Sequence, residues 1–275
     1  MRGLAEFVMK GRRQAIMAVL LLGLIPLINL FNPVVVGLVM LRKGWKEAAI
    51  VLSWALLPVL AWAVAGDIVP IIMLLGISGL SLLLRESESW EFTLLAATLI
   101  GVSVEFYLKL QPAMLDLILE QMELYLSTNG LQDVQIDAQL RETLTSFIGA
   151  VYMFLAIVSL MAARWMQAAL FNPGGFQKEF HDLRVEQKVA LLILGLMVLA
   201  NMGVLIPQTW ILYLVMPLIF SGVALIHSVV KMKNLSSMWL VVFYALFMLP
   251  LIVQMVVLLA LLDSWYDFRA RLSST

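Results

Sequence analysis

Long apolar runs, separated by short groups of charged or turn-forming residues, occupy most of this chain. A helix needs about 20 apolar residues to cross the roughly 30 Å hydrocarbon core of a bilayer. Six runs have about this length, and a seventh, longer run could cross with a tilt. The sequence therefore predicts an all-α, polytopic transmembrane helical bundle with seven full spans, at residues 48–65, 68–84, 92–108, 144–163, 189–206, 210–230 and 238–262.

The composition excludes a soluble domain. Hydrophobic residues make up 63% of the chain and charged residues 13%, with a mean hydropathy of +0.99, whereas about a quarter of a soluble domain is charged. The formal net charge is zero and no long basic face is present, so we expect a lipid bilayer and no nucleic acid as partner. With no cysteine and only His181 and His227, we expect neither a metal site nor a cofactor.

The first apolar region, residues 14–41, is interrupted by the sequence Asn29-Leu30-Phe31-Asn32-Pro33. Lysines and arginines flank it on both sides, and short loops rich in these residues stay in the cytoplasm. We therefore predict a re-entrant hairpin of two short helices that enters and leaves on the same face. The alternative is one continuous helix, which would carry both Pro26 and Pro33.

The distribution of basic residues then sets the orientation. With the hairpin in place, 14 of the 18 lysines and arginines fall inside and four fall outside: Lys109, Arg141, Arg269 and Arg271. This predicts a multi-pass protein of the cell inner (cytoplasmic) membrane with a cytoplasmic N-terminus. It also places the C-terminal tail, residues 263–275, on the outer side. No small-x-small cleavage site follows the first apolar stretch, so we expect that stretch to be retained.

Residues 1–275 form a single integral membrane domain in this interpretation, with one polar excursion on the outer side at residues 109–142. Apolar residues at helical spacing predict an amphipathic helix over residues 112–126, with Pro112 in its first turn. A second helix is expected to begin near Gln135 and to continue into the next span. The excursion is either a cap on the outer surface or a lid over a cavity.

Prolines and amides inside the spans are the first candidate ligand site. Pro58, Pro217 and Pro250 lie near the middle of three spans, and each releases a backbone carbonyl that another group must bond. An amide could bond such a carbonyl or bind a polar group of a ligand, and two tryptophans deep in the predicted span 48–65 could line a cavity or pack in the core. The candidate ligand-binding residues are Asn29, Asn32, Asn201, Gln254, Trp54 and Trp62.

Two carboxylates lie in or between the spans. Glu105 is the clear case within a span, and an ionisable group there is a functional hypothesis by default. Lys109 follows it at i+4, however, so we expect a structural ion pair on the helix surface. Asp67 follows a glycine between two spans, and we interpret it as a turn residue.

The tetrapeptide Leu-Phe-Asn-Pro occurs twice, at residues 30–33 and 170–173, as in an internal repeat of the transporter kind. The second copy opens the longest predicted cytoplasmic loop, residues 171–184. A proline and two glycines there favour a sharp turn that would present two phenylalanines together. We interpret Phe171, Asn172, Pro173 and Phe176 as a partner-docking surface, or alternatively as the start of an interfacial helix.

No P-loop, G-x-G-x-x-G, H-E-x-x-H or G-x-S-x-G motif is present. The sequence therefore predicts no enzyme. Energy for any transport would have to come from a partner protein or an ion gradient.

The N-terminal sequence Met-Arg-Gly-Leu-Ala-Glu-Phe-Val-Met-Lys-Gly-Arg-Arg, the first Phe-Asn-Pro and the later Phe-Asn-Pro-Gly-Gly-Phe resemble the YybS-like bacterial membrane proteins. That family is grouped by fold with the substrate-binding S components of energy-coupling-factor transporters. The resemblance implies a compact helical bundle with a small-molecule pocket opening outward, but it implies no particular site residues. This chain also has more apolar segments than the six of a typical S component.

Two functions of different classes follow from these observations. The first is a small-solute-binding transport subunit that engages an energising partner on the cytoplasmic side. The second is a non-transporting scaffold or assembly protein of the cell envelope. A polar cavity reachable from outside would favour the first, and a solid apolar core would favour the second.

Overall fold

The structure is a computed structural model that describes residues 1–26, 28–128 and 137–273. Within these residues the chain is helical and contains no strand. The helices are α1 (Arg2–Met9), α2 (Arg12–Leu24), α3 (Phe31–Lys43), α4 (Trp45–Val64), α5 (Val69–Ser87), α6 (Trp90–Leu110), α7 (Pro112–Thr128), α8 (Ala138–Phe171), α9 (Gly175–Asp182), α10 (Gln187–Asn201), α11 (Ile211–Met232), α12 (Met238–Leu246), α13 (Pro250–Tyr266) and α14 (Phe268–Ser273), with the short 3-10 helices η1 (Ile28–Leu30) and η2 (Gln208–Trp210).

Five helices of the described chain are long and apolar enough to cross a membrane. They are α4, α5, α6, α8 and the continuous segment Gln208–Met232 formed by η2 and α11. The protein therefore has the helical architecture of a membrane protein, as its sequence predicted. The predicted number of seven full spans is not found.

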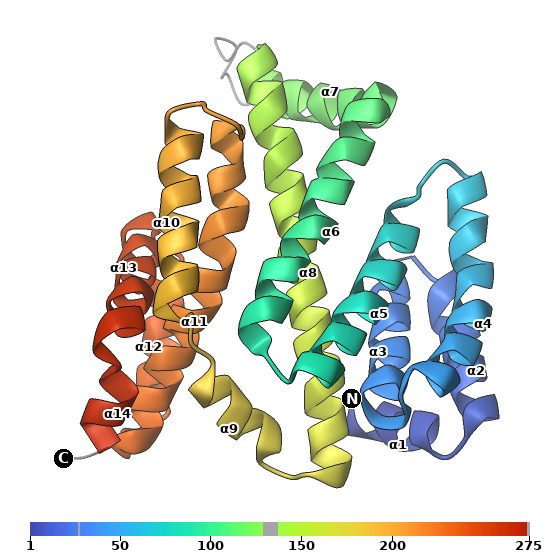
Figure 1. Ribbon diagram of the computed structural model, residues 1–275. Coiled ribbons are helices and arrows are strands. Elements are labelled where there is room, and N and C mark those ends of the chain that lie inside the picture. Colours follow the sequence, from blue (N-terminus) through green and yellow to red (C-terminus); the bar gives the residue numbers. More distant parts are fainter. Residues whose placement is uncertain (27, 129–136, 274–275) are drawn as a thin grey trace.

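The helices form three groups (Figure 1). Helices α2 to α5 pack together on one side, α6 and α8 pack on each other in the centre, and α10 to α14 lie on the other side. One large apolar core joins the first two groups, and a smaller core lies among α10, α11 and α13. Helix α1 packs against α2 and α8 and buries Ala5 and Val8 there.

Residues 14–41 form two helices, α2 and α3, which pack against each other. Helix α2 ends where Ile25 takes an extended conformation just before Pro26, because a proline disfavours the helical conformation in the residue before it. The alternative of a single continuous helix is therefore wrong.

The predicted span 238–262 is wrong as one helix. The chain forms α12 and α13 instead, and the helix direction bends by 114° between them. Pro250 lacks an N–H group and its ring crowds the carbonyl of the residue four positions earlier, which favours a break in the helix at this position. Leu249 is accordingly extended, and Pro250 becomes the first residue of α13.

The predicted span 189–206 is also shorter than expected. Helix α10 ends at Asn201 and contains 15 residues, about 22 Å at 1.5 Å per residue. The chain leaves the helix through Gly203, whose φ of +67° lies in the left-handed region that ends many helices. This helix is apolar, but it is too short to cross a bilayer on its own.

The reversal at Pro250 returns the C-terminal tail to the end of the bundle from which α12 begins. Arg184, which precedes α10, forms an ion pair of 2.5 Å with Asp267 of the tail. The prediction that the tail lies on the side opposite the 171–184 loop is therefore wrong. All 18 lysines and arginines except Lys109 and Arg141 now lie at or toward the end that carries both termini.

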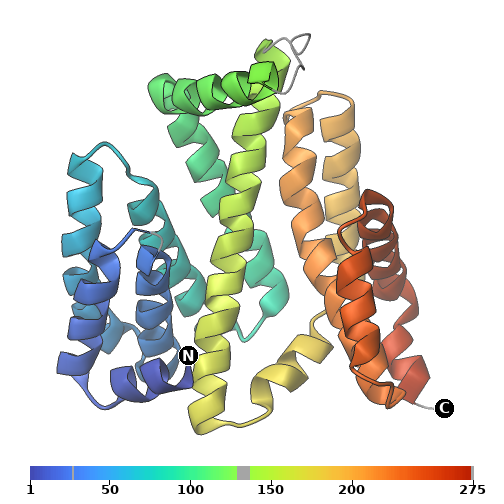
Figure 2. The same cartoon turned by 180° about the vertical axis from the view of Figure 1, so that it is seen from behind.

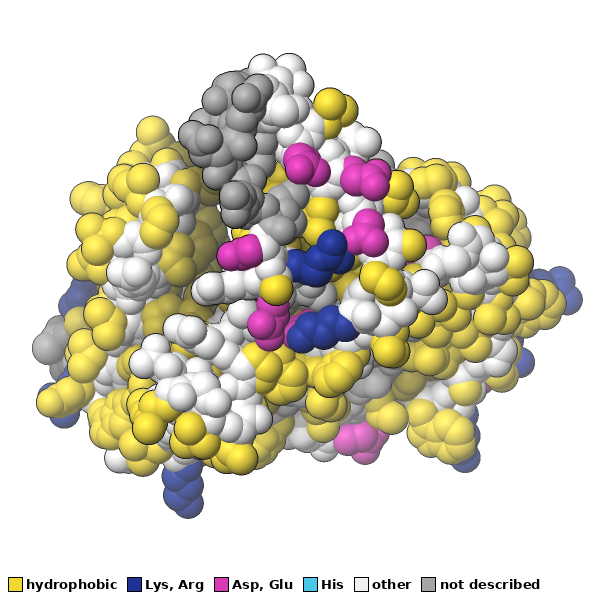
Figure 3. Space-filling model, turned by 90° about the horizontal axis from the view of Figure 1, so that it is seen from above, with side chains coloured by type: hydrophobic (Ala, Val, Ile, Leu, Met, Phe, Trp, Pro, Cys, Tyr) yellow, Lys and Arg dark blue, Asp and Glu magenta, His cyan; other side chains and the backbone are white. Residues whose placement is uncertain are grey.

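The opposite end of the bundle is acidic (Figure 3). Helix α7 lies across it and packs on α6 (Figure 1), so the predicted amphipathic helix at residues 112–126 is confirmed. Arg141 of α8 forms an ion pair of 2.7 Å with Asp116 of α7. The expected turn at Asn129-Gly130 and the expected helix start near Gln135 lie outside the described residues, and α8 begins at Ala138.

Candidate functional site

The short helices α2 and α3 leave space beside their longer neighbours. Each has 13 residues, about 20 Å, whereas the 20 residues of α4 extend about 30 Å. The connection between α2 and α3 therefore lies below the turn between α4 and α5 (Figures 1 and 2). A cavity of about 370 Å³ occupies this region, and residues of the α2–α3 connection, α4, α5 and α8 line it.

The cavity has mainly apolar walls, with polar groups from three directions. Asn29 comes from the α2–α3 connection, Asp67 from the α4–α5 turn and Tyr152 from α8. One oxygen of Asp67 accepts the Val69 N–H at 3.0 Å, which begins α5. Within the described residues, the Asn29 amide and the Tyr152 hydroxyl have no hydrogen-bond partner, so both are available to a ligand.

Trp62 closes the cavity on the α4 side. Its indole N–H donates to the carbonyl of Gly23 at 3.0 Å, one of the last carbonyls of α2, which the helix itself leaves unbonded. This contact holds the end of α2 against α4. Trp62 therefore contributes its ring, and not its N–H group, to the cavity.

Asn32 lies buried beside the cavity and stabilises its wall. Its Nδ2 donates to the carbonyl of Ala55 at 3.3 Å, three residues before Pro58 in α4. Pro58 disturbs the backbone hydrogen bonds of that turn, and the bond from Asn32 ties the same turn to α3. Gly23 completes the fit, because a Cβ there would lie 2.5 Å from Pro58 Cγ and 2.8 Å from Asn32 Nδ2.

The structure brings only some of the six candidate ligand-binding residues together. Asn29 and Trp62 line the cavity, and Asn32 packs beside it. Trp54 is 45% exposed, because eight residues of helix separate it from Trp62 by about 80° around the axis. Asn201 and Gln254 are exposed on α10 and α13, far from this cavity along the chain and in the fold.

Two cavity residues were not among the predicted site residues. Asp67 was interpreted as a turn residue only, and it does make the turn contact, but it also lines the cavity. Tyr152 sits within a continuous apolar run of α8, where nothing in its neighbours distinguishes it from a core tyrosine. Its position opposite Asn29 depends on how α8 packs on the first helices.

Glu105 forms the expected ion pair with Lys109, but its carboxylate is buried and does not lie on the helix surface. Its side chain is 1% exposed, and three donors surround it. Lys109 Nζ lies 2.6 Å from Oε1, Trp210 Nε1 donates to Oε1 at 3.3 Å, and the Tyr213 hydroxyl donates to Oε2 at 2.7 Å. The pair with Lys109 is present, but the carboxylate is mainly a link from α6 to η2 and α11.

Two glycines allow Tyr213 to reach this carboxylate. A Cβ at Gly149 of α8 would lie 2.2 Å from the Tyr213 hydroxyl, and a Cβ at Gly101 of α6 would lie 2.8 Å from its ring. The tyrosine ring therefore lies where α6 and α8 approach most closely. Small residues at such a crossing are typical of helix packing in membranes.

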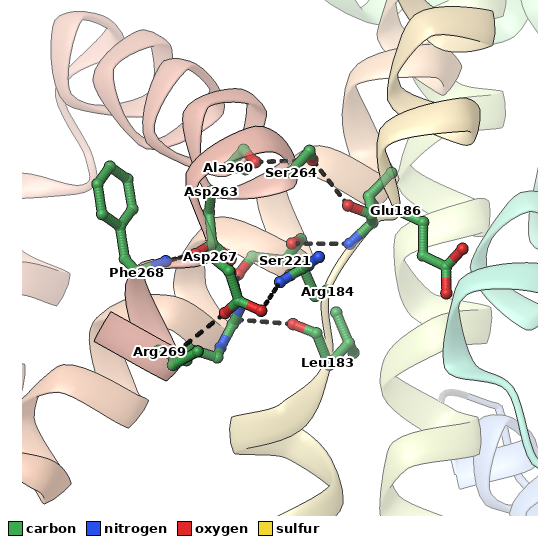
Figure 4. A network of polar contacts seen from close by, with 12 residues as sticks. Leu183, Arg184, Glu186, Ser221, Ala260, Asp263, Ser264, Asp267, Phe268 and Arg269 are labelled. Carbon is green, nitrogen blue, oxygen red and sulfur yellow. Dashed lines mark hydrogen bonds and ion pairs between the residues drawn. The ribbon is translucent and has the colours of Figure 1, made fainter. Parts of the chain in front are cut away.

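A polar network holds the segment between α9 and α10 against the C-terminal helices (Figure 4). Arg269 forms a buried ion pair with Asp263 and donates to the Leu183 carbonyl at 2.8 Å. The Ser264 hydroxyl donates to the Val185 carbonyl at 2.7 Å. On the other side, Oε1 of Glu91 accepts the Glu186 N–H at 2.6 Å, which ties the same segment to α6.

This network joins the segment before α10 to α6, α11 and the C-terminal helices. Each described charge that it buries has a partner from the chain, and the bonds go largely to the backbone of residues 183–186. The sequence did not predict this network, because the C-terminal tail was expected on the outer side of the membrane.

The 171–184 loop does not present its two phenylalanines together. Phe171 ends α8 and lies under the guanidinium of Arg42, 4.0 Å from Cζ to the ring centroid. Phe176 turns inward from α9 and packs against Trp90 and Phe180. The two phenylalanines are therefore separated, because the aromatic face of α9 packs against the core, and the docking role of Phe171, Asn172, Pro173 and Phe176 stays a prediction.

No protein-family model, curated protein or solved structure matches this chain. Within the described residues, no group of three or more histidine, cysteine, aspartate or glutamate side chains could hold a metal ion.

Proposed function

We propose that this protein is a small-solute-binding transport subunit of the cell inner membrane. The observation that carries the proposal is the cavity above the α2–α3 hairpin, where the Asn29 amide and the Tyr152 hydroxyl face a space of about 370 Å³. Ligand sites are typically concave and largely apolar, with a few convergent polar groups. A site of this kind fits the YybS-like resemblance of the sequence.

The charge distribution supports an orientation in which the cavity faces the outer half of the membrane. All but two of the 18 lysines and arginines lie toward one end, and that end is cytoplasmic by the positive-inside rule. The N-terminus and the C-terminal tail are then both inside. Helices α2 and α3 form a re-entrant hairpin from the cytoplasmic side, and broken backbone of this kind is tolerated in a membrane where protein or a cavity covers it.

The cavity wall also indicates the class of solute. Among its lining residues, Asp67 is the charged one, so an anionic solute would meet a like charge. The remaining wall is apolar apart from the amide and hydroxyl groups. We therefore assign the site to a small neutral or cationic solute with an apolar body. Energy for its movement comes from a cytoplasmic partner protein or an ion gradient, because the sequence has no nucleotide-binding motif.

A thermal-shift screen with small amines and neutral solutes tests this function. Leu155 lines the cavity, and Leu155→Trp fills part of it, whereas Leu99→Trp makes the same exchange at a position of α6 that is 69% exposed. We expect at least one solute to raise the unfolding temperature of the wild type and of Leu99→Trp, but not of Leu155→Trp. A screen in which every active solute acts equally on all three proteins would favour the scaffold function.

A further inference from the structure

Helix α9 lies at the end of the bundle that carries both termini, between the C-terminal end of α8 and α11 (Figure 2), and this end is cytoplasmic in the proposed orientation. It is amphipathic, with Phe176 and Phe180 on the face that packs against the core. Gln177 and His181, one turn apart, line two adjoining hollows on either side of the helix. One hollow is apolar and the other is polar.

The apolar hollow has a volume of about 580 Å³ and lies between α8 and α9. Val158 and Trp165 of α8 are 40% and 41% exposed there, and Phe176 and Phe180 form the α9 side. Because α8 is a candidate membrane-spanning helix, this hollow faces the hydrocarbon of the inner leaflet in the proposed orientation. Trp165 has the amphipathic ring that is common at the level of lipid headgroups.

The polar hollow has a volume of about 480 Å³, and it is rich in cations. Lys178 and Lys231 line it and form no ion pair with any described residue. Arg269 also lines it, but Asp263 already neutralises this arginine. Asp182 is the carboxylate in the wall, so the lining keeps an excess of positive charge.

We propose that the two adjoining hollows bind one anionic phospholipid. The headgroup phosphate lies at Lys178, His181 and Lys231, and an acyl chain lies in the apolar hollow between α8 and α9. Basic pockets between membrane helices on the cytoplasmic side suit anionic headgroups, and here a chain-sized apolar space continues directly from the pocket. This site is separate from the solute cavity and does not depend on it.

The test measures binding of phosphatidylglycerol and phosphatidylcholine to the purified full-length protein in mild detergent, by native mass spectrometry and by thermal unfolding. We expect phosphatidylglycerol to bind more tightly and to raise the unfolding temperature more. The double variant Lys178→Gln/Lys231→Gln should weaken phosphatidylglycerol binding at least about tenfold, since each lysine near an anionic lipid contributes roughly 1 kcal/mol. Phosphatidylcholine binding should not change.

Two controls make the result specific. Lys10→Gln/Lys233→Gln removes the same charge at the same end of the protein from exposed lysines outside both hollows, and it should leave phosphatidylglycerol binding within about twofold of the wild type. Glycerol phosphate, which lacks acyl chains, should not stabilise the protein. Equal losses in both double variants, equal binding of the two lipids, or full stabilisation by glycerol phosphate alone would each overturn the lipid site.

Discussion

The hydroxyl of Tyr213 donates a hydrogen bond of 2.7 Å to Oε2 of Glu105, across the crossing of α6 and α8. Both side chains are buried. This contact joins the helices of the first half of the chain to those of the second half. Glu105, a carboxylate inside a predicted span, therefore links its own helix α6 to α11.

The first prediction concerns this contact. Tyr213→Phe removes the donor and leaves a buried carboxylate oxygen without it, which should lower the free energy of unfolding by about 1 to 3 kcal/mol. Tyr244→Phe is the matched control, because Tyr244 bonds His227 but is 47% exposed. Unfolding midpoints in the same detergent measure both, and an equal effect of the two changes would contradict the structural link.

The second prediction concerns the hairpin beside the cavity. Gly23→Ala places a methyl group 2.5 Å from Pro58 Cγ, so α2 must move away from α4. We expect a loss of about 1 to 3 kcal/mol in stability, the usual cost of overpacking. Gly195→Ala adds a methyl group to a helix where nothing lies within 4 Å, and it should be neutral or slightly stabilising. Similar behaviour of the two variants would show that α2 does not pack tightly on α4.

The third prediction concerns topology, and the absence of native cysteine makes it simple to test. A membrane-impermeant thiol reagent added to intact cells should label Ser127→Cys on α7. It should not label Gln177→Cys on α9 or Ala270→Cys on α14 until the membrane is permeabilised. Labelling of Ala270→Cys together with Ser127→Cys would contradict the proposed cytoplasmic position of the tail.

The fourth prediction concerns pH. Burial holds the pKa of His181 below its ordinary value, Asp182 opposes this effect, and Lys231 and Arg269 add to it. A depressed histidine pKa means that the unfolded chain binds more protons below about pH 6.5, so stability falls as the pH drops through and below that value. His181→Gln should reduce the loss of unfolding temperature between pH 7.5 and pH 5.5. An unchanged or larger loss in this variant would refute the assignment.

The sequence was sufficient to predict an all-helical membrane protein, the interruption of residues 14–41 and the amphipathic helix α7, because these depend on local apolar length and periodicity. It could not predict which prolines break a helix. Pro58 and Pro217 lie inside continuous helices, whereas Pro250 begins a new one. The turn before Pro58 accepts a hydrogen bond from Asn32 of α3, and a contact between two helices of this kind cannot be read from the sequence around the proline.

The candidate site was only partly predictable for the same reason. Asn29 and Trp62 were recognised as polar or amphipathic residues in apolar surroundings, but Tyr152 and Asp67 join the cavity through packing between helices distant in the sequence. The missed reversal at Pro250 also hid the ion pair between Asp263 and Arg269. Because the chain was expected to cross the membrane at residues 238–262, the sequence did not predict the contacts of Asp263 and Arg269 with the segment before α10.

Native mass spectrometry of the gently extracted protein tests the solute-binding cavity most directly. We expect the wild type and Leu99→Trp to carry a small additional mass that is released at higher collision energy. Leu155→Trp, which fills the cavity beside Tyr152, should lack that mass while remaining folded. An identical additional mass in all three proteins, or none in the wild type after extraction directly from native membranes, would contradict the proposal that this cavity holds a solute.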